Sequence, residues 1–507
     1  MQSLTRRELL RLLALLPAVG IPGPAPRRRA SARPQGQLPP NILILVFDAL
    51  SAEHVQLYGY RRSTTPNLAR FAERAVVFHS HYSAGSFTTS GTASLLTGSY
   101  PWSHRAINLQ GTALDEFTDR SIFGLLGQVG YHRLAYSHNI VVASLLDQFR
   151  SDIDRFALTR ELCLQDPYAS QWMFQRDFTP AVQAESLIRR RGDASSSLFL
   201  YEIYRFWMSH LGRQLNARYH DRFPRGVPGI EDRVFLLEDA VDWTMGQLEA
   251  MPRPFLGYLH FLPPHDPYRA RQDFVGRFAD GWAPPPKPAH PLSAGVTEEF
   301  VVNARREYDE YIAYADAEFG RLLDFMQAKG ILETTYVIVT SDHGEMFERG
   351  IWEHITPVLF EPIIRIPLIV SQPGQGLRRD VHGLTSSVDI VPTLLQAAGL
   401  PKPEWCEGEA LPLLGDREAG TERAVYSLDA KESSKFGPLT KRTVGLVRGR
   451  YKIVHYLGYA GYDDVYELYD LRDDPQELRN IYSPSSGIAS DLKALLRQRS
   501  PELNRRV

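Results

Sequence analysis

Acidic and imidazole side chains follow three apolar runs of the sequence. Asp48 directly ends one run, His265 comes shortly after a second, and the pair Asp342-His343 follows a third. Carboxylate oxygens and imidazole nitrogens bind divalent cations such as Mn²⁺, Zn²⁺, Mg²⁺ or Ca²⁺. Taken singly, Asp48 could cap a helix, Asp342 could lie in a turn and His343 could be a structural histidine. Together they predict a divalent metal site.

A hydroxyl-rich segment, 83–101, contains the candidates for a nucleophile. It reads SAGSFTTSGTASLLTGSYP and leads into a predicted helix over 91–96. The N-terminus of a helix attracts anions, and a bound cation can lower the pKa of a hydroxyl and hold it for attack. Alternatively, these hydroxyls only cap the helix. Their spacing does not separate the two interpretations.

The elements that must position these residues are strands and helices in alternation. Continuous apolar runs predict buried strands at 42–47, 255–261, 336–340 and 364–370. Helical spacing over 297–330 produces one apolar stripe, formed by Tyr311, Ala315, Phe319, Leu322 and Met326. Alternating strands and helices predict an α/β fold with a large, mainly parallel sheet flanked by helices. Ligands of such folds bind beyond the carboxyl ends of the strands, where the acidic and histidine residues fall.

Composition indicates a soluble globular chain of 507 residues, with 43% hydrophobic and 23% charged residues. A net charge of −2 does not indicate binding to nucleic acid. Two cysteines form neither a disulfide framework nor a zinc cluster. We expect a main domain over 38–400, with an insertion or cap at about 141–251, and a smaller antiparallel subdomain over 401–507. No segment is long and apolar enough to predict a transmembrane helix. The oligomeric state stays open.

The first 37 residues differ from the rest, with a basic start, a short apolar stretch and a tail rich in Pro, Arg and Ala. Arg6 and Arg7 stand where a twin-arginine export signal has its arginine pair. The apolar stretch is too short to span a bilayer. We therefore expect export to the periplasm or the medium. The alternative is a cytoplasmic protein with a basic N-terminal tail.

The order of several segments resembles the sulfatase family of the alkaline phosphatase superfamily. The most similar stretches are NILILVFDAL, ASLLTGSYPWSH, YDEYIAYADAEFGRLLDFMQAKGILETTYVIVTSDHGE and ELYDLRDDPQELRNI. The resemblance covers most of residues 41–482. It implies an alkaline-phosphatase/sulfatase-like fold and a metal-dependent enzyme acting on phosphate or sulfate esters.

The resemblance also implies roles for individual residues. Asp48 corresponds to a metal aspartate, and Asp342 with His343 corresponds to the second pair of metal ligands. His265 corresponds to a histidine that contacts the substrate. His354 lies near a Lys or His that contacts the transferred group in relatives, although it could be a plain loop histidine.

Two features depart from the family pattern. Sulfatases usually have two adjacent aspartates where this chain has Phe47-Asp48. The Lys-x-His that helps to hold sulfate is absent, and His138 and Asn139 occupy its place as candidate substrate-binding residues.

The nucleophile position departs furthest from the family. Sulfatases carry Cys-x-Pro-Ser-Arg there, and counting back from the Leu-Thr-Gly at 96–98 places Thr88 at the position of the cysteine. Threonine cannot become formylglycine, because its β-carbon carries a methyl group. A threonine beside Asp, Asp and His resembles phosphoethanolamine and glycerol-phosphate transferases and nucleotide phosphodiesterases. This implies a metal-bound Thr88 nucleophile and a covalent phospho-threonine, with His265 or His354 protonating the leaving oxygen.

Two other functions stay open from the sequence. The chain could hydrolyse sulfuric esters without formylglycine, or it could be a non-catalytic binding protein on the same fold. We expect an ester substrate of small-molecule, glycan or lipid type.

Overall fold

The computed structural model describes residues 39–157, 159–164, 199–230, 233–413 and 423–507. Residues Pro39–Val507 form one compact unit. The segment expected to carry the export signal lies outside the described residues.

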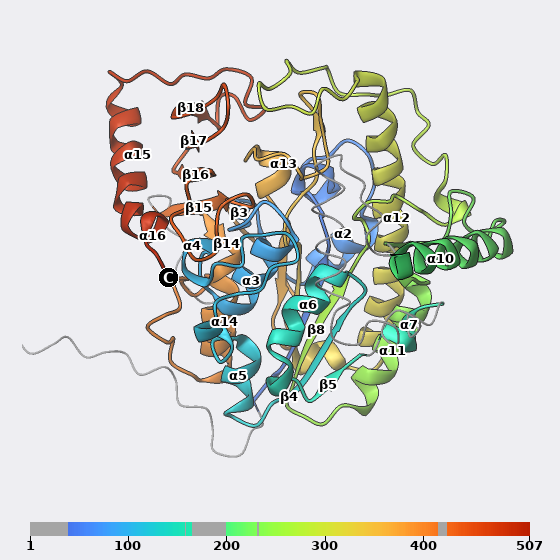
Figure 1. Cartoon of the computed structure of the whole chain (residues 1–507). Coiled ribbons are helices and arrows are strands. Elements are labelled where there is room, and N and C mark those ends of the chain that lie inside the picture. Colours follow the sequence, from blue (N-terminus) through green and yellow to red (C-terminus); the bar gives the residue numbers. More distant parts are fainter. Residues whose placement is uncertain (1–38, 158, 165–198, 231–232, 414–422) are drawn as a thin grey trace, which may run out of the picture. The chain divides into compact units, whose positions relative to one another are not determined.

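The core of the fold is an eight-stranded sheet with the order β13-β2-β12-β9-β1-β8-β4-β5. Figure 1 labels β8, β4 and β5 of this sheet. At its centre, β1 (Asn41–Phe47) pairs in parallel with β8 (Phe255–Phe261) and with β9 (Thr335–Thr340). Every residue of β1 and β8 is buried. The strands predicted at 42–47, 255–261 and 336–340 are therefore confirmed. Each reads as a continuous apolar run because helices cover both faces of the sheet.

The other strands of this sheet are β4 (His132–Ser137), β5 (Arg155–Phe156), β2 (Val76–Phe78), β12 (Leu368–Ser371) and β13 (Arg379–Val381). The expected strand at 364–370 is partly wrong. Its first residue belongs to the short helix α13 (Glu361–Ile364), and the strand begins only at Leu368, after Pro367. β12 also runs antiparallel to both of its neighbours, so the sheet is mixed but mainly parallel.

Alternate residues of β1 face two separate apolar clusters, one on each side of the sheet. Leu43 and Leu45 pack with α2 (Pro66–Ala72), α11 (Leu237–Ala250) and α12 (Glu298–Ala328). On the other side, the cluster is completed by α3 (Thr88–Thr97), α5 (Ile122–Gly127), α6 (Ile140–Gln148) and α14 (Ile390–Ala398). The helix predicted over 297–330 is confirmed as α12, whose N-cap Thr297 accepts a hydrogen bond from the Phe300 N–H.

The region expected to be an insertion, 141–251, contributes in part to this core. β5 extends the central sheet beside β4, and α11 packs on α12. These parts of the expected insertion or cap are thus built into the central sheet and its helical layer. Residues 165–198 of the region lie outside the described residues. Helix α10 (Phe199–Arg218) follows them.

A second sheet of four antiparallel strands follows near the C-terminus. It consists of β15 (Ala424–Asp429), β16 (Arg442–Arg448), β17 (Tyr451–Leu457) and β18 (Val465–Asp470). Helix α15 (Gly487–Gln498) contacts β16 and β17. This sheet matches the antiparallel part of the expected fold class.

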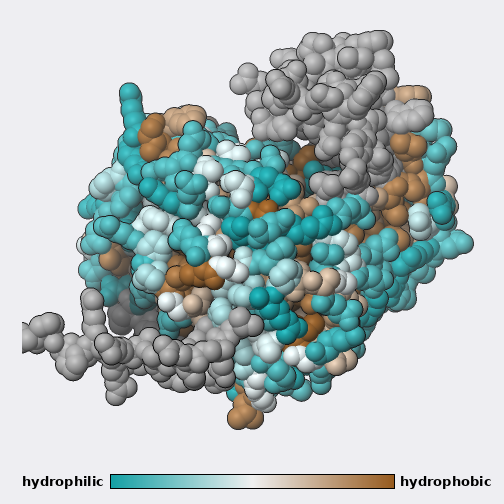
Figure 2. All heavy atoms as spheres, turned by 90° about the horizontal axis from the view of Figure 1, so that it is seen from below, coloured by the Kyte–Doolittle hydropathy of each residue, from teal (hydrophilic) through white to brown (hydrophobic). Residues whose placement is uncertain are grey.

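The remaining described elements are short. They are β3 (His81–Tyr82), α4 (Pro101–His104), α7 (Thr159–Leu162), β6 (Gly229–Ile230), β7 (Arg233–Val234), β10 (Phe347–Glu348), β11 (Ile351–Trp352), β14 (Thr385–Ser386) and α16 (Ser500–Asn504). Within the described ranges, none of the helices is both long and apolar enough to cross a bilayer. Hydrophilic side chains dominate the face shown in Figure 2, as expected for the outer surface of helices packed on a sheet.

Candidate functional site

Three side chains from the ends of two adjacent strands meet at the carboxyl edge of the central sheet. Asp48 follows β1, and Asp342 and His343 follow β9. Their ligand atoms lie within 4.8 Å of one another. His343 Nε2 is 3.6 Å from Asp48 Oδ1 and 3.6 Å from Asp342 Oδ2, and all three side chains are fully buried. The structure therefore brings together the three residues predicted from the sequence as metal ligands, because neighbouring parallel strands end at the same edge.

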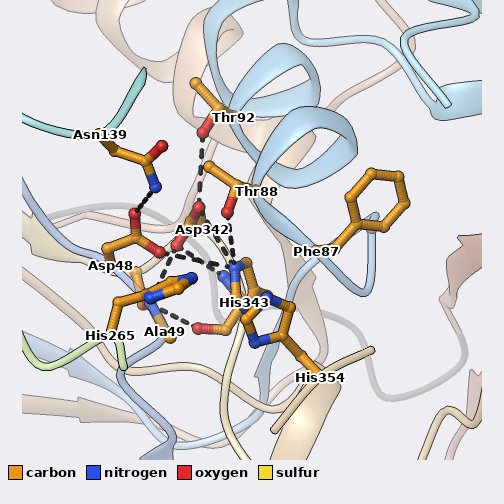
Figure 3. A network of polar contacts seen from close by, with 12 residues as sticks. Asp48, Ala49, Phe87, Thr88, Thr92, Asn139, His265, Asp342, His343 and His354 are labelled. Atoms are coloured by element: carbon orange, nitrogen blue, oxygen red, sulfur yellow. Dashed lines mark hydrogen bonds and ion pairs between the residues drawn. The ribbon is translucent and has the colours of Figure 1, made fainter. Parts of the chain in front are cut away.

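Thr88 stands directly above this cluster (Figure 3). Its Oγ1 lies 3.2 Å from His343 Nε2. The helix predicted over 91–96 begins earlier than expected, with Thr88 as the first residue of α3 after the N-cap Phe87. The helix N-terminus places a partial positive charge beside the Thr88 oxygen.

Gly91 explains how α3 approaches the cluster so closely. A Cβ atom at this position would lie 2.2 Å from the backbone oxygen of Asp342. One turn of the helix therefore rests on the backbone of a candidate metal ligand. The neighbouring Thr92 places its Oγ1 3.5 Å from Asp342 Oδ2. The small residues of the segment thus serve close packing as well as chemistry.

His265 and His354 also border the cluster, as predicted. The ring centroids of His354 and His343 are 4.1 Å apart, and those of His265 and His354 are 5.1 Å apart. His265 Nδ1 lies 2.6 Å from the backbone oxygen of Asp266 and donates a hydrogen bond to it. His354 Nδ1 lies 3.0 Å from Glu345 Oε1.

The two histidines have opposite electrostatic environments. Burial lowers the pKa of His354 well below its usual value, and the charges of His343 and His265 lower it further. Burial also opposes the charged form of His265, but the charge of Asp48 and the Asp266 carbonyl outweigh it and raise its pKa. An acid and a base of different strength thus lie side by side.

The pKa values of the two carboxylates of the cluster also shift in opposite directions. Burial alone would raise the pKa of Asp48, but the neighbouring histidines, His265 first, outweigh it and lower the pKa to about 2. Burial and the negative charge of Asp48 raise the pKa of Asp342. Two buried carboxylates whose oxygens lie within 4.8 Å of each other favour a cation between them.

His138 and Asn139, the candidate substrate-binding pair, separate in the structure. Asn139 caps α6 through Oδ1 and donates from Nδ2 to Asp48 Oδ2 at 2.5 Å. It therefore orients a candidate metal ligand. His138 instead stacks on Phe235 with ring centroids 3.7 Å apart and contacts the backbone oxygen of Leu162. The structure does not place His138 at the site, because consecutive residues after a strand point in different directions.

Sequence reasoning missed His260, which lies inside the strand β8. Its Nε2 is 3.1 Å from Asp48 Oδ2 and 3.8 Å from Asp342 Oδ2, and Tyr258 OH is 2.8 Å from its Nδ1. The sequence feature that could have identified His260 is a histidine within a buried apolar strand. Glu345, the hydrogen-bond partner of His354, was missed as well, although it lies two residues after His343.

The donor set fits a divalent cation. Asp48 Oδ1 is buried without a hydrogen-bond partner, a costly state that a bound cation would relieve. Two carboxylates, imidazole nitrogens and a hydroxyl suit Mn²⁺, Zn²⁺, Mg²⁺ or Ca²⁺ in differing degrees.

Comparisons with known proteins identify the family to which the sequence is similar. A sequence profile described as Sulfatase matches residues 40–400, and a second, described as N-sulphoglucosamine sulphohydrolase, C-terminal, matches residues 349–504. A choline-sulfatase from Rhizobium meliloti is 26% identical over 474 residues, which cover 87% of this chain and 82% of the relative.

Solved structures show the same fold. The phosphonate monoester hydrolase of Agrobacterium radiobacter superimposes with a TM-score of 0.65 at 20% identity, over 92% of this chain and 97% of that one. A protein solved in complex with its substrate D-glucosamine-2-N,6-O-disulfate superimposes with a TM-score of 0.64 at 17% identity, over 92% and 98% of the two chains.

Proposed function

The chain belongs to the sulfatase family, within the alkaline phosphatase superfamily, and we propose that it is a metal-dependent hydrolase or transferase of phosphate or phosphonate esters with Thr88 as its nucleophile. The single observation that carries this proposal is the 3.2 Å separation between Thr88 Oγ1 and His343 Nε2, beside Asp48 and Asp342. The similarity to a phosphonate monoester hydrolase supports the choice of ester.

Asp48, Asp342, His343 and Thr88 are the residues that would hold the cation. A divalent ion there would lower the pKa of the Thr88 hydroxyl and stabilise negative charge on the transferred group. Asn139 contributes by holding Asp48 Oδ2, which leaves Oδ1 facing the site. Formylglycine is not part of the proposal, because the nucleophile position is a threonine.

The reaction has two steps. Thr88 Oγ1, having lost its proton to solvent, bonds to phosphorus while the bond to the leaving oxygen breaks. His265, whose pKa is raised, supplies the proton that this oxygen takes and regains one from solvent, while the neutral His354 contacts the transferred group. Water or an alcohol then attacks the phospho-threonine, the Thr88 oxygen leaves and recovers its proton, and phosphate or a new ester departs. The N-terminus of α3 stabilises the charge that develops in both steps.

A substrate panel tests the proposal. The purified full chain, loaded with each of the four cations in turn, is assayed with 4-nitrophenyl phosphate, its diester, a 4-nitrophenyl phosphonate and 4-nitrophenyl sulfate. We expect turnover of a phosphorus ester, and a peptide containing Thr88 that carries one phosphoryl group after acid quenching. Turnover of the sulfate alone would favour the sulfuric ester hydrolase suggested by the similarity to choline-sulfatase. Tight metal binding without any turnover would favour a binding protein.

Export is a separate proposal that depends on Arg6 and Arg7. Fractionation of a bacterial host with a twin-arginine translocase should place the full chain in the periplasm. Replacement of both arginines by lysine should retain it in the cytoplasm. Equal distribution of the two proteins would refute the proposal.

A further inference from the structure

The C-terminal sheet holds the segment that leads into the nucleophile. The Leu428 N–H, in β15, donates to the backbone oxygen of Ala84 at 2.9 Å. The neighbouring Ser427 hydroxyl donates to the backbone oxygen of Ser83 at 2.6 Å. Ser86, two residues before Thr88, donates its hydroxyl to Asp429 Oδ2 at 2.7 Å. Strand β15 therefore anchors both the backbone and a side chain of segment 83–87.

Lys431 extends this anchor to the other side of the site. Its Nζ is 3.1 Å from Asp429 Oδ2 and donates to the backbone oxygens of His354 at 3.0 Å and Ile355 at 2.8 Å. The ammonium also lies 5.1 Å from the ring centroid of Phe87, the N-cap of α3. The Lys431 ammonium therefore links Asp429 to the loop that carries His354.

We propose that Asp429 and Lys431 are positioning residues that hold Thr88 and His354 in register with each other. This inference rests on the proposed function, which requires the nucleophile and the histidine that contacts the transferred group at a fixed separation. Asp429 is 1% exposed, so its carboxylate depends on Lys431 and Ser86 for partners. Loss of Lys431 would free the 353–356 loop and weaken the hold on segment 83–87 at once.

Gly85 shows how little room segment 83–87 has to move. A Cβ atom there would lie 2.1 Å from Ser90 Oγ and 2.6 Å from the Gly91 nitrogen. The segment is packed directly on the first turn of α3, so a shift of the anchor passes to Thr88. Displacing a reacting group by about 1 Å costs on the order of 10²-fold in rate.

Kinetics of the full chain provide the first test. Lys431→Met should lower kcat by roughly 10- to 100-fold and leave KM within about twofold, because the contacts it removes do not touch the substrate. Lys431→Arg, which keeps the charge and the donors, should recover most of kcat. Lys441→Met is the matched control, since Lys441 belongs to the same part of the chain but pairs with the exposed Glu432. A raised KM with unchanged kcat, or no effect, would overturn the proposal.

Hydrogen exchange measured by mass spectrometry tests the same link without a substrate. In Lys431→Met, amides of segments 83–90 and 353–357 should exchange about tenfold faster than in wild type, and in Lys441→Met they should not. Ser86→Ala removes only the hydrogen bond from the Ser86 hydroxyl to Asp429 and should speed exchange in segment 83–90 alone. This variant keeps the test usable if Lys431→Met folds poorly. Unchanged exchange in both variants would refute the anchor. Altered exchange in a protein that turns over no ester would retain the anchor and refute the proposed function instead.

Discussion

Thr88 Oγ1 lies 3.2 Å from His343 Nε2, although 255 residues separate the two in the chain. One comes from the first turn of a helix and the other from the loop after a central strand. Gly91 permits this approach, because the helix rests on the backbone of Asp342. The relationship places a hydroxyl where the candidate metal ligands converge.

Thr88→Ala should reduce turnover by at least about 10³-fold, because it removes the atom that bonds to the transferred group. Thr89→Ala and Ser90→Ala are the controls, since both hydroxyls are buried in the same turn and Ser90 donates only to the backbone oxygen of Phe87. Initial rates with the preferred ester of the panel measure the effect. A larger loss in Thr89→Ala than in Thr88→Ala would show that the nucleophile was assigned to the wrong hydroxyl.

Asp342→Ala should abolish tight binding of a divalent cation. The substitution removes one of two buried carboxylates and leaves Asp48 without its partner across the site. At a free metal concentration of 100 Kd, binding should stabilise wild type by about 2.7 kcal/mol and this variant not at all. Metal content by mass spectrometry and thermal unfolding with and without a chelator measure both effects.

Glu333→Ala is the control for the metal experiment. Glu333 is an exposed carboxylate that pairs with Arg74 outside the site, so its loss should leave metal content unchanged. Stoichiometric metal in Asp342→Ala would contradict the ligand set.

The stability of the protein should depend on pH through Glu353. Burial, followed by the negative charge of Asp266, raises the pKa of Glu353 from 4.5 to about 7. The folded protein therefore keeps a proton that the unfolded chain loses, so its contribution to the free energy of unfolding is present below pH 4.5 and declines as the pH rises to 7. Urea unfolding at several pH values should show a more positive slope of the free energy of unfolding against pH, between 4.5 and 7, in Glu353→Gln than in wild type, because buried histidines such as His81 and His104 contribute the opposite slope. The exposed Glu299→Gln should match wild type, and an unaltered slope in Glu353→Gln would disprove the assignment.

Lys452→Met should destabilise the fold strongly. The fully buried Lys452 ammonium contacts Glu361 Oε1 at 2.9 Å, pairs with the buried Glu477 and donates to the backbone oxygen of Leu359 at 3.0 Å. Removing one partner of a buried ionic cluster costs about 3–5 kcal/mol, because the remaining charges lose their compensation. Lys441→Met, which breaks a partly exposed pair, should cost less than about 1 kcal/mol. Urea unfolding measures both, and a loss below 1 kcal/mol for Lys452→Met would show that water compensates Glu361 and Glu477.

The local sequence pattern was sufficient for the central strands and for most of the site. Buried parallel strands must be apolar on both faces, so β1, β8 and β9 were recognisable as runs. Asp48, Asp342 and His343 follow two of these runs, and the carboxyl ends of adjacent parallel strands share one edge. The strands and the three metal-ligand candidates needed only residue type and position along the chain. Thr88 was selected among several hydroxyls by the resemblance to the sulfatase family, counted back from Leu-Thr-Gly at 96–98.

Tertiary structure alone decided which neighbouring side chains face the site. Asn139 reaches Asp48 whereas the adjacent His138 stacks on Phe235, and His260 reaches both carboxylates from within an apolar strand. The late start and antiparallel direction of β12, and the contact between Lys431 and the loop of His354, likewise depend on the order of the strands in space. The periodicity of a sequence reports which residues are buried. It does not report which buried residue meets which, because that depends on segments hundreds of residues apart.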